Sequence, residues 1–192
     1  MSRIIIARHI PSAADPDGWK ILTSKAEGGK HAIATFGPDS VHHELHDGNM
    51  FSYSERLTLA SAAGREVVFV APPAGRRPAH LKINVKSTKE LTADFFEGGT
   101  GAVGAEITNV FNRCRFSTNA PIGKLYEVGS VAAGTQIDFD LGGSSNKAGG
   151  EVRGESEWNL NSSEKYRLLV TSNEASNLIV IKFDWYEPDE VF

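Results

Sequence analysis

Residues 157–187, EWNLNSSEKYRLLVTSNEASNLIVIKFDWYE, decide the fold class of this chain. Apolar and polar side chains alternate in two runs, 166–171 and 179–185, and both runs are rich in β-branched and aromatic residues. Alternation with period two is typical of a strand with one buried face. The polar link 172–177 contains small residues that tolerate turns. The stretch therefore predicts a β-hairpin whose second strand carries a phenylalanine and a tryptophan into a core.

The same alternation recurs earlier in the chain, from residue 41 onward. The expected strands are 51–59, 66–70, 81–86, 91–97, 106–111, 122–128, 135–141 and 151–160. Turn residues separate them at intervals of about 8–12 residues, and no segment has a sustained helical period. This spacing predicts an all-β fold, an antiparallel β-sandwich or barrel. The number and length of the strands favour a jelly-roll-like arrangement.

Residues 1–40 have a different character. Proline and glycine interrupt them so often that no long element fits, although one strand is expected near 31–36. Residues 19–22 could form a short turn of helix or a brief strand. We interpret 1–40 as an extended N-terminal arm or edge extension that packs on a neighbour, and 41–192 as the sandwich body. The alternative is that 1–40 forms an irregular first layer of the same domain.

The composition indicates a soluble globular protein. The 192 residues are 40% hydrophobic and 23% charged, with a formal net charge of −4. Because 24 Asp and Glu outnumber 20 Lys and Arg, direct binding to nucleic acid is not expected. The apolar run at 4–7 is too short for a signal peptide or membrane span, which favours synthesis in a cytoplasm. The single cysteine, Cys114, permits no intrachain disulfide, and we expect a buried thiol.

Two motifs suggest chemistry at first sight. On a strand, His42, Glu44 and His46 would share one face and could bind a divalent metal. On a helix, His42 and His46 would lie four residues apart, but Glu44 would be misplaced for the HExxH motif. The alternative without a metal is a polar strand that ends in a turn. Residues 99–104 match GxGxxG, the dinucleotide fingerprint. That motif requires a helix after it, and 105–111 is β-rich, so a flexible loop between strands is the better interpretation.

Asp138 and Asp140 flank Phe139 in an alternating run. The alternation predicts that both carboxylates face solvent while Ile137, Phe139 and Leu141 face inward. A calcium site with Asn146 would not match the EF-hand spacing. No serine lies in a GxSxG motif. We therefore expect no enzyme activity, no catalytic residues, no metal and no cofactor.

Two pairs of arginines stand close together in the sequence. Arg113 and Arg115 lie between Phe111 and Phe116, and the second pair is Arg76–Arg77. Arginine and aromatic residues are enriched in protein interfaces. The alternative is ordinary surface charge beside phenylalanines of the core.

Several motifs, in this order, resemble a known family. They are His46-Asp47-Gly48, Phe111-Asn112-Arg113-x-Arg115, the paired glycines at 142–143 and 149–150, Glu157-Trp158-Asn159-Leu160, Tyr166 and Asp184-Trp185-Tyr186-Glu187. The set resembles small virion structural proteins of tailed bacteriophages, the capsid decoration or cement proteins. The resemblance spans about residues 41–187, so 1–40 and 188–192 lie outside it.

The resemblance implies a β-sandwich that binds the outer capsid surface and stabilises the shell. The implied partners are the major capsid protein and neighbouring copies of this chain, as a dimer or trimer, with no membrane and no direct nucleic acid. The protein would be made in the bacterial cytoplasm and reside on the virion. The candidate contact residues are Ile4, Ile5, Ile6, Trp19, Arg76, Arg77, Arg113 and Arg115.

A competing function is recognition of host glycan by a phage fibre or surface module. The loops 98–104 and 142–150 would then carry the specificity, and exposed aromatic rings would support the sugar. The exposure of Trp158, Trp185 and Tyr186 discriminates between the two functions, since rings buried in the core cannot stack on a glycan.

Overall fold

The computed structural model describes residues 5–8, 20–25, 31–36, 40–75, 78–142, 150–152 and 157–188, and it describes side chains from Glu44 onward except in 150–152. The chain forms two compact units, Met1–His43 and Glu44–Phe192. We call the second unit the body.

The first unit contains a small antiparallel sheet. Its strands are β1 (Ile5–Arg8), β2 (Lys20–Lys25) and β3 (His31–Phe36), in the order β1-β2-β3. The strand expected at 31–36 is confirmed, β2 forms over the brief strand considered at 19–22, and β1 forms where no element was predicted.

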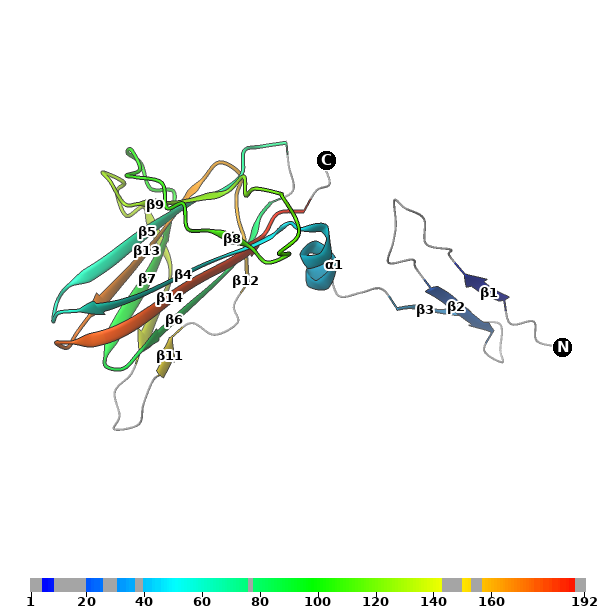
Figure 1. The fold of residues 1–192 in the computed structure, drawn as a ribbon, viewed down its shortest axis with the longest axis horizontal. Coiled ribbons are helices and arrows are strands. Elements are labelled where there is room, and N and C mark those ends of the chain that lie inside the picture. The colour runs from blue at the N-terminus through cyan, green and yellow to red at the C-terminus, as the bar shows by residue number, and fades with distance from the viewer. Residues whose placement is uncertain are drawn as a thin grey trace. The chain divides into compact units, whose positions relative to one another are not determined.

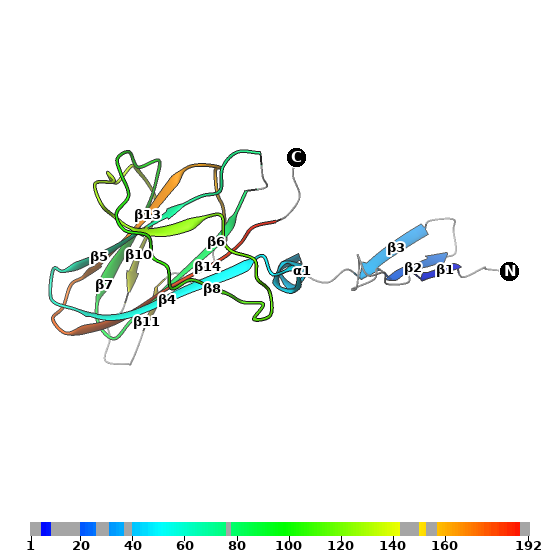
Figure 2. The same cartoon turned by 45° about the horizontal axis from the view of Figure 1, so that its top comes forward.

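The body consists of two sheets packed face to face, preceded by helix α1 (Ser40–Asp47) (Figures 1 and 2). One sheet has the order β11-β6-β14-β4-β8, with β12 also paired to β6, and the other has the order β10-β7-β13-β5-β9. The strands of the first are β4 (Met50–Leu59), β6 (His80–Ser87), β8 (Phe111–Asn112), β11 (Gly150–Val152), β12 (Glu157–Asn159) and β14 (Asn177–Tyr186). The strands of the second are β5 (Gly64–Val70), β7 (Leu91–Glu97), β9 (Lys124–Glu127), β10 (Thr135–Gly142) and β13 (Lys165–Ser172).

This arrangement confirms the predicted all-β antiparallel sandwich. Strands β4 and β5 are consecutive in the chain but lie in different sheets, and the same holds for β6 and β7, β10 and β11, and β13 and β14. These four connections join the strand order β11-β6-β14-β4 of one sheet to the order β10-β7-β13-β5 of the other. This is the eight-stranded jelly-roll topology. Strands β8 and β9 are short additions that come from the connection between β7 and β10.

The predicted hairpin at 166–185 is wrong. Strand β13 pairs with β5 and β7, whereas β14 pairs with β4 and β6. The link between them crosses from one sheet to the other and is held by Asn177, whose Oδ1 accepts a hydrogen bond from the Lys89 backbone N–H at 2.9 Å. Its Nδ2 donates to the Glu90 carbonyl at 3.1 Å. The buried amide thus connects two crossovers, because Lys89 and Glu90 belong to the link between β6 and β7.

Three other element predictions need correction. Residues 40–47 form a helix rather than a polar strand, so His42, Glu44 and His46 do not lie on a strand face. The strand expected at 106–111 is mostly irregular, with one isolated bridge from Glu106 to Tyr126. The strand expected at 151–160 is divided into β11 and β12, which pair with β6 at different positions.

The core is built around the indole of Trp185. Its ring centroid lies 5.7 Å from that of Phe51 and 5.3 Å from that of Phe69, which belongs to the opposite sheet. The predicted burial of Phe183 and Trp185 is confirmed, since both are fully inaccessible to solvent. Beneath the indole, its Nε1 donates a hydrogen bond to Glu187 Oε1 at 2.9 Å.

The long connection between β7 and β10 covers part of the outer face of the five-stranded sheet. Backbone hydrogen bonds join its two halves, including Ala132 N–H to the Thr100 carbonyl and Ser130 N–H to the Ala102 carbonyl. Gly101 has φ +111°, and a Cβ there would lie 2.3 Å from the Ser130 carbonyl oxygen. The GxGxxG segment is therefore a loop, as expected, whose glycines allow close approach of backbone to backbone.

Candidate protein-interaction site

Two exposed phenylalanines of the body lie in one short segment. Phe111 and Phe116 are 56% and 86% exposed, and Arg113 and Arg115 between them are exposed as well. We call residues 111–116 the aromatic–arginine turn. The alternative that these phenylalanines belong to the core is therefore wrong.

Asn112 fixes the backbone of this turn. Its Nδ2 donates to the Gly48 carbonyl at 2.6 Å and to the Asn119 carbonyl at 3.1 Å. Its Oδ1 accepts from the Cys114 backbone N–H at 2.9 Å. The Asn112 side chain thus joins the turn to Gly48, which follows α1, and to Asn119, which follows the turn.

Cys114 and Asn119 complete the support. The buried thiol of Cys114 lies inside the turn, 3.8 Å from the His46 carbonyl at the end of α1. Asn119 Nδ2 donates to the Asp47 carbonyl at 3.1 Å. Gly48 ends α1 with φ +77°, and a Cβ at this position would lie 2.2 Å from Ser117 Oγ. Helix α1 and the turn can pack this closely only because residue 48 is glycine.

The arrangement presents two rings and two guanidinium groups on a rigid base. The Arg115 guanidinium lies over the Phe111 ring, 5.6 Å from its centroid, and Arg113 Nη1 lies 3.5 Å from Met50 Sδ. Arginine and aromatic side chains in a preformed conformation are the usual anchors of protein interfaces, because little conformational entropy is lost on binding. The turn therefore suits a protein partner with an apolar and acidic surface.

Replacing Asn112 by alanine should both destabilise the body and loosen the turn. The substitution leaves the Cys114 N–H and the Gly48 carbonyl without their partner, which should cost about 1–3 kcal/mol of unfolding free energy. Urea unfolding measures the loss, and hydrogen exchange at Cys114 reports the loosening. Thr118→Ala, an exposed substitution in the same segment, should change neither; equal protection of Cys114 in N112A and the wild type would contradict this role for Asn112.

The other candidate contact residues are less well placed. Ile5 and Ile6 lie in β1, where only the backbone is described, and Ile4, Trp19, Arg76 and Arg77 lie outside the described residues. Of the candidate contact residues, only Arg113 and Arg115 have described side chains, and both are exposed. Asn146, the third residue of the possible calcium site, also lies outside the described part of the chain. Within that part, no group of three or more His, Cys, Asp or Glu side chains is placed to hold a metal ion.

The predicted inward orientation of Ile137 is confirmed, since this residue packs against the core, but the predicted orientation of residues 138–141 in strand β10 is wrong. A register shift between Gln136 and Asp138 sets Asp138 opposite the core residue Phe95, and Phe139 opposite Asp94 on the outer face. As a result Phe139 is 64% exposed and Leu141 is 74% exposed, while Asp138 and Asp140 are half-buried. Sequence reasoning missed this surface because a β-bulge reverses the faces of every residue after it.

The outer face of the six-stranded sheet carries a polar cluster around Glu157. Its Oε1 lies 2.7 Å from both His80 Nδ1 and the Tyr186 hydroxyl, and its Oε2 lies 3.1 Å from Lys82 Nζ. Burial raises the pKa of Glu157, but hydrogen bonds from Tyr186, Lys82 and His80 outweigh it and hold the pKa below its ordinary value. These contacts connect Glu157 of β12 to β6 and β14.

The three aromatic residues that would mark a glycan platform are part of the interior. Trp185 is fully buried and Tyr186 is 7% exposed, with its ring stacked on His80. Trp158 is half-buried, and its ring centroid lies 5.8 Å from that of Phe95 in the core. Their burial leaves none of them as an open stacking surface for a sugar.

Comparisons with known proteins assign the chain to no family. No protein-family model matches the chain, and no curated protein matches it. Among the described residues, no helix has the length and apolar character needed to cross a membrane.

Proposed function

We propose that this protein is a phage virion structural protein that binds the outer surface of the capsid and stabilises the shell. The observation that carries the proposal is the aromatic–arginine turn, in which exposed phenylalanine and arginine side chains project from a backbone held by hydrogen bonds on a β-sandwich. The order of the sequence motifs, which resembles the capsid decoration proteins, supports the major capsid protein as the partner. The burial of Trp158, Trp185 and Tyr186 favours this function over glycan recognition.

A physical argument links such a surface to shell stability. A capsid filled with DNA is under internal pressure, and every interface that bridges adjacent subunits must break before they separate. Each bridging interface can be of ordinary size, about 1,000–2,000 Å², because many copies act together. A sandwich with a fixed interior and preformed contact residues transmits the load without rearranging.

The test uses shells assembled from the major capsid protein of the phage whose genome encodes this chain. Shells saturated with the full chain should resist heat better than bare shells, and the variant F111S/F116S should bind with at least about tenfold lower affinity because two interface anchors are lost. Occupancy is measured by sedimentation with the shells, and heat resistance by light scattering.

The control is Leu178→Ser, which changes an exposed apolar residue on β14, outside the turn. It should bind shells as the wild type does. Shells that neither retain the wild-type chain nor gain heat resistance from it would refute the proposed function.

A further inference from the structure

An aromatic ring and a carboxylate stand beside each other on the outer face of the five-stranded sheet. The register sets Phe139 of β10 directly opposite Asp94 of β7, and Asp94 opposite Leu169 of β13. Side chains that face each other across strands in this way have Cβ atoms about 4.5–5.5 Å apart. Phe139 is 64% exposed, and Leu141, two residues further along the same face, is 74% exposed. We call Phe139, Leu141 and Asp94 the ring–carboxylate site.

The charge of this site is not neutralised by the part of the chain that the structure describes. Asp94 is half-buried, and its Oδ1 accepts a hydrogen bond from the neutral Gln136 side chain at 2.8 Å. Within the described residues Asp94 has no ion pair, and the Phe139 ring has no aromatic or cationic contact. Strands β7 and β10 contain no lysine, arginine or histidine. The site therefore presents a negative charge beside an exposed ring.

The same face of the sheet shows which group fits between a ring and a carboxylate. The Arg167 guanidinium lies over the Phe96 ring, 6.0 Å from its centroid, and its Nη2 forms an ion pair with Glu66. A guanidinium is planar and delocalised, so it can stack on a ring and donate to a carboxylate at the same time. Phe96, Arg167 and Glu66 thus form a complete group of three, whereas Phe139 and Asp94 form the same pair without an arginine.

We propose that the ring–carboxylate site holds an arginine side chain of an adjacent capsid subunit. The guanidinium stacks on the Phe139 ring and donates to Asp94, while the methylene groups of the arginine cover Leu141. A stacked and paired arginine is a common energetic anchor of protein interfaces. The inference rests on the proposed function and adds to it a second contact, separate from the aromatic–arginine turn.

The charge of Asp94 decides which kind of partner fits. A neutral sugar or a purely apolar segment would cover this carboxylate without neutralising it, and burying an unpaired charge costs free energy. A lysine supplies the positive charge but has no planar group to stack on Phe139. An arginine meets both requirements, as Arg167 does beside Phe96 and Glu66.

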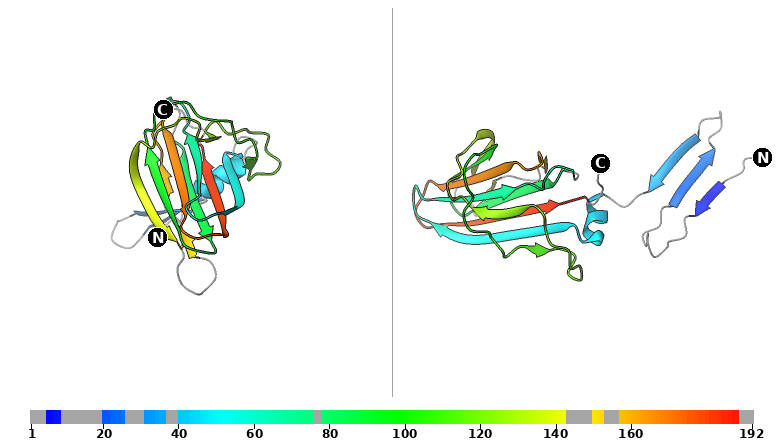
Figure 3. Two further views of the ribbon diagram at one scale, coloured as in Figure 1. Left: turned by 90° about the vertical axis from the view of Figure 1, so that its left-hand side faces the viewer. Right: turned by 90° about the horizontal axis from the view of Figure 1, so that it is seen from above.

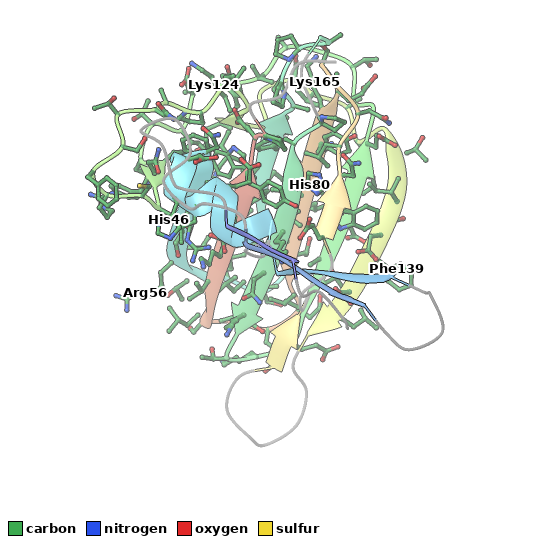
Figure 4. All side chains as sticks on the ribbon, turned by 90° about the vertical axis from the view of Figure 1, so that its right-hand side faces the viewer. His46, Arg56, His80, Lys124, Phe139 and Lys165 are labelled. Atoms are coloured by element: carbon green, nitrogen blue, oxygen red, sulfur yellow. The ribbon has the colours of Figure 1, made fainter. Side chains whose placement is uncertain are left out.

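The ring–carboxylate site lies at the opposite edge of the sandwich from the aromatic–arginine turn. Strand β8, where the turn begins, is the last strand of its sheet next to β4. Strand β10 is the last strand of the other sheet and contacts β11, at the far end from β8. In the left view of Figure 3, β10 in yellow and the green segment that contains β8 are at opposite sides. In Figure 4, Phe139 and His46, whose carbonyl contacts the turn, are likewise on opposite sides. One body with a contact at each edge spans two neighbouring subunits.

The experiment uses full-length chains and shells assembled from the major capsid protein of the same phage. Asp94→Asn removes the charge but keeps an acceptor for Gln136, and Phe139→Leu removes the ring but keeps an apolar side chain. Sedimentation should show that each variant binds shells about five- to tenfold more weakly than the wild type, because a charge-assisted and stacked contact is lost. Shells saturated with either variant should also disrupt at a lower temperature, as measured by light scattering.

The matched control is Glu174→Gln, which neutralises an exposed carboxylate in the link between β13 and β14. It should bind and stabilise shells as the wild type does. Equal urea midpoints show that all variants are folded.

Modified shells identify the group that the site holds. Shells treated with phenylglyoxal, which modifies arginine, should bind the wild type and D94N equally. Shells acetylated at lysine should keep the difference between the two chains. The comparison isolates the Asp94 contact, because loss of any other arginine or lysine weakens the binding of both chains alike.

Three results would overturn the inference. They are D94N and F139L chains that bind and stabilise shells as the wild type does, a difference between the wild type and D94N that survives arginine modification, and a dimer in the absence of shells that D94N abolishes. The last would place the arginine on a second copy of this chain. Failure of the proposed function has another signature, because the wild type itself would then neither bind shells nor raise their heat resistance.

Discussion

Trp185→Ala should remove about 3–5 kcal/mol of unfolding free energy. The indole is fully buried between Phe51 and Phe69, so truncation leaves a cavity between the two sheets and loses two ring contacts. A loss of this size is a large part of the total stability of a domain, which is about 5–15 kcal/mol. Urea unfolding measures it directly, and the melting temperature should fall by about 10 °C.

The matched control for this substitution lies on the same strand. Leu178→Ala changes an apolar side chain of β14 that is 39% exposed, so it should cost about 0.5 kcal/mol or less. Trp185→Phe retains an aromatic ring but removes the hydrogen bond to Glu187, and it should fall between the two. A loss below about 1 kcal/mol for W185A would mean that the sheets close over the gap, against the close packing of the indole between them.

Glu187→Ala should be nearly as damaging, at about 3 kcal/mol. The buried carboxylate accepts three hydrogen bonds: from Trp185 Nε1, from the Gly123 backbone N–H at 2.8 Å and from the Ile122 backbone N–H at 2.9 Å. Removing it leaves three donors without an acceptor at the end of β14. Urea unfolding gives the loss, and hydrogen exchange should accelerate most at residues 122 and 123.

Glu187→Gln separates hydrogen bonding from packing, because the amide keeps one acceptor oxygen and the shape of the side chain. It should lose about half as much stability as the alanine variant. If both variants were as stable as the wild type, the carboxylate would not be what attaches the 122–123 segment to the core.

The sequence predicted which stretches form strands and, in most of them, which side faces inward. Leu81, Ile83 and Val85 alternate strictly with polar residues, and all three are buried. Alternation fixes the facing of a strand, because successive side chains point to opposite sides. It does not specify the pairing partner, which is why β13 and β14 could be mistaken for a hairpin: both strands have one buried face, and the partners are far away in the chain.

The errors concern features that the local sequence does not encode. A bulge adds one residue to a strand without a distinctive residue type, and the one near Ile137 reversed the facing of Phe139 and Leu141. Helix α1 has only eight residues, too few for a clear helical period.

The candidate site was predicted in part. The arginines of the turn were identified from their aromatic neighbours, but the sequence did not show whether those phenylalanines are exposed, because β8 has only two residues and a strand this short shows no alternation.

The central strand of each sheet comes after all the other strands of that sheet along the chain. Strand β13 is the middle strand of the order β10-β7-β13-β5-β9, and β14 is the middle strand of β11-β6-β14-β4-β8. During synthesis on the ribosome, the flanking strands of each sheet emerge before the central strand that lies between them. Neither sheet can therefore form completely until residues 165–186 have left the exit tunnel. For most of its synthesis the nascent chain must therefore stay soluble without a complete sheet. A chain released by a ribosome that stalls before residue 165 cannot form the jelly roll.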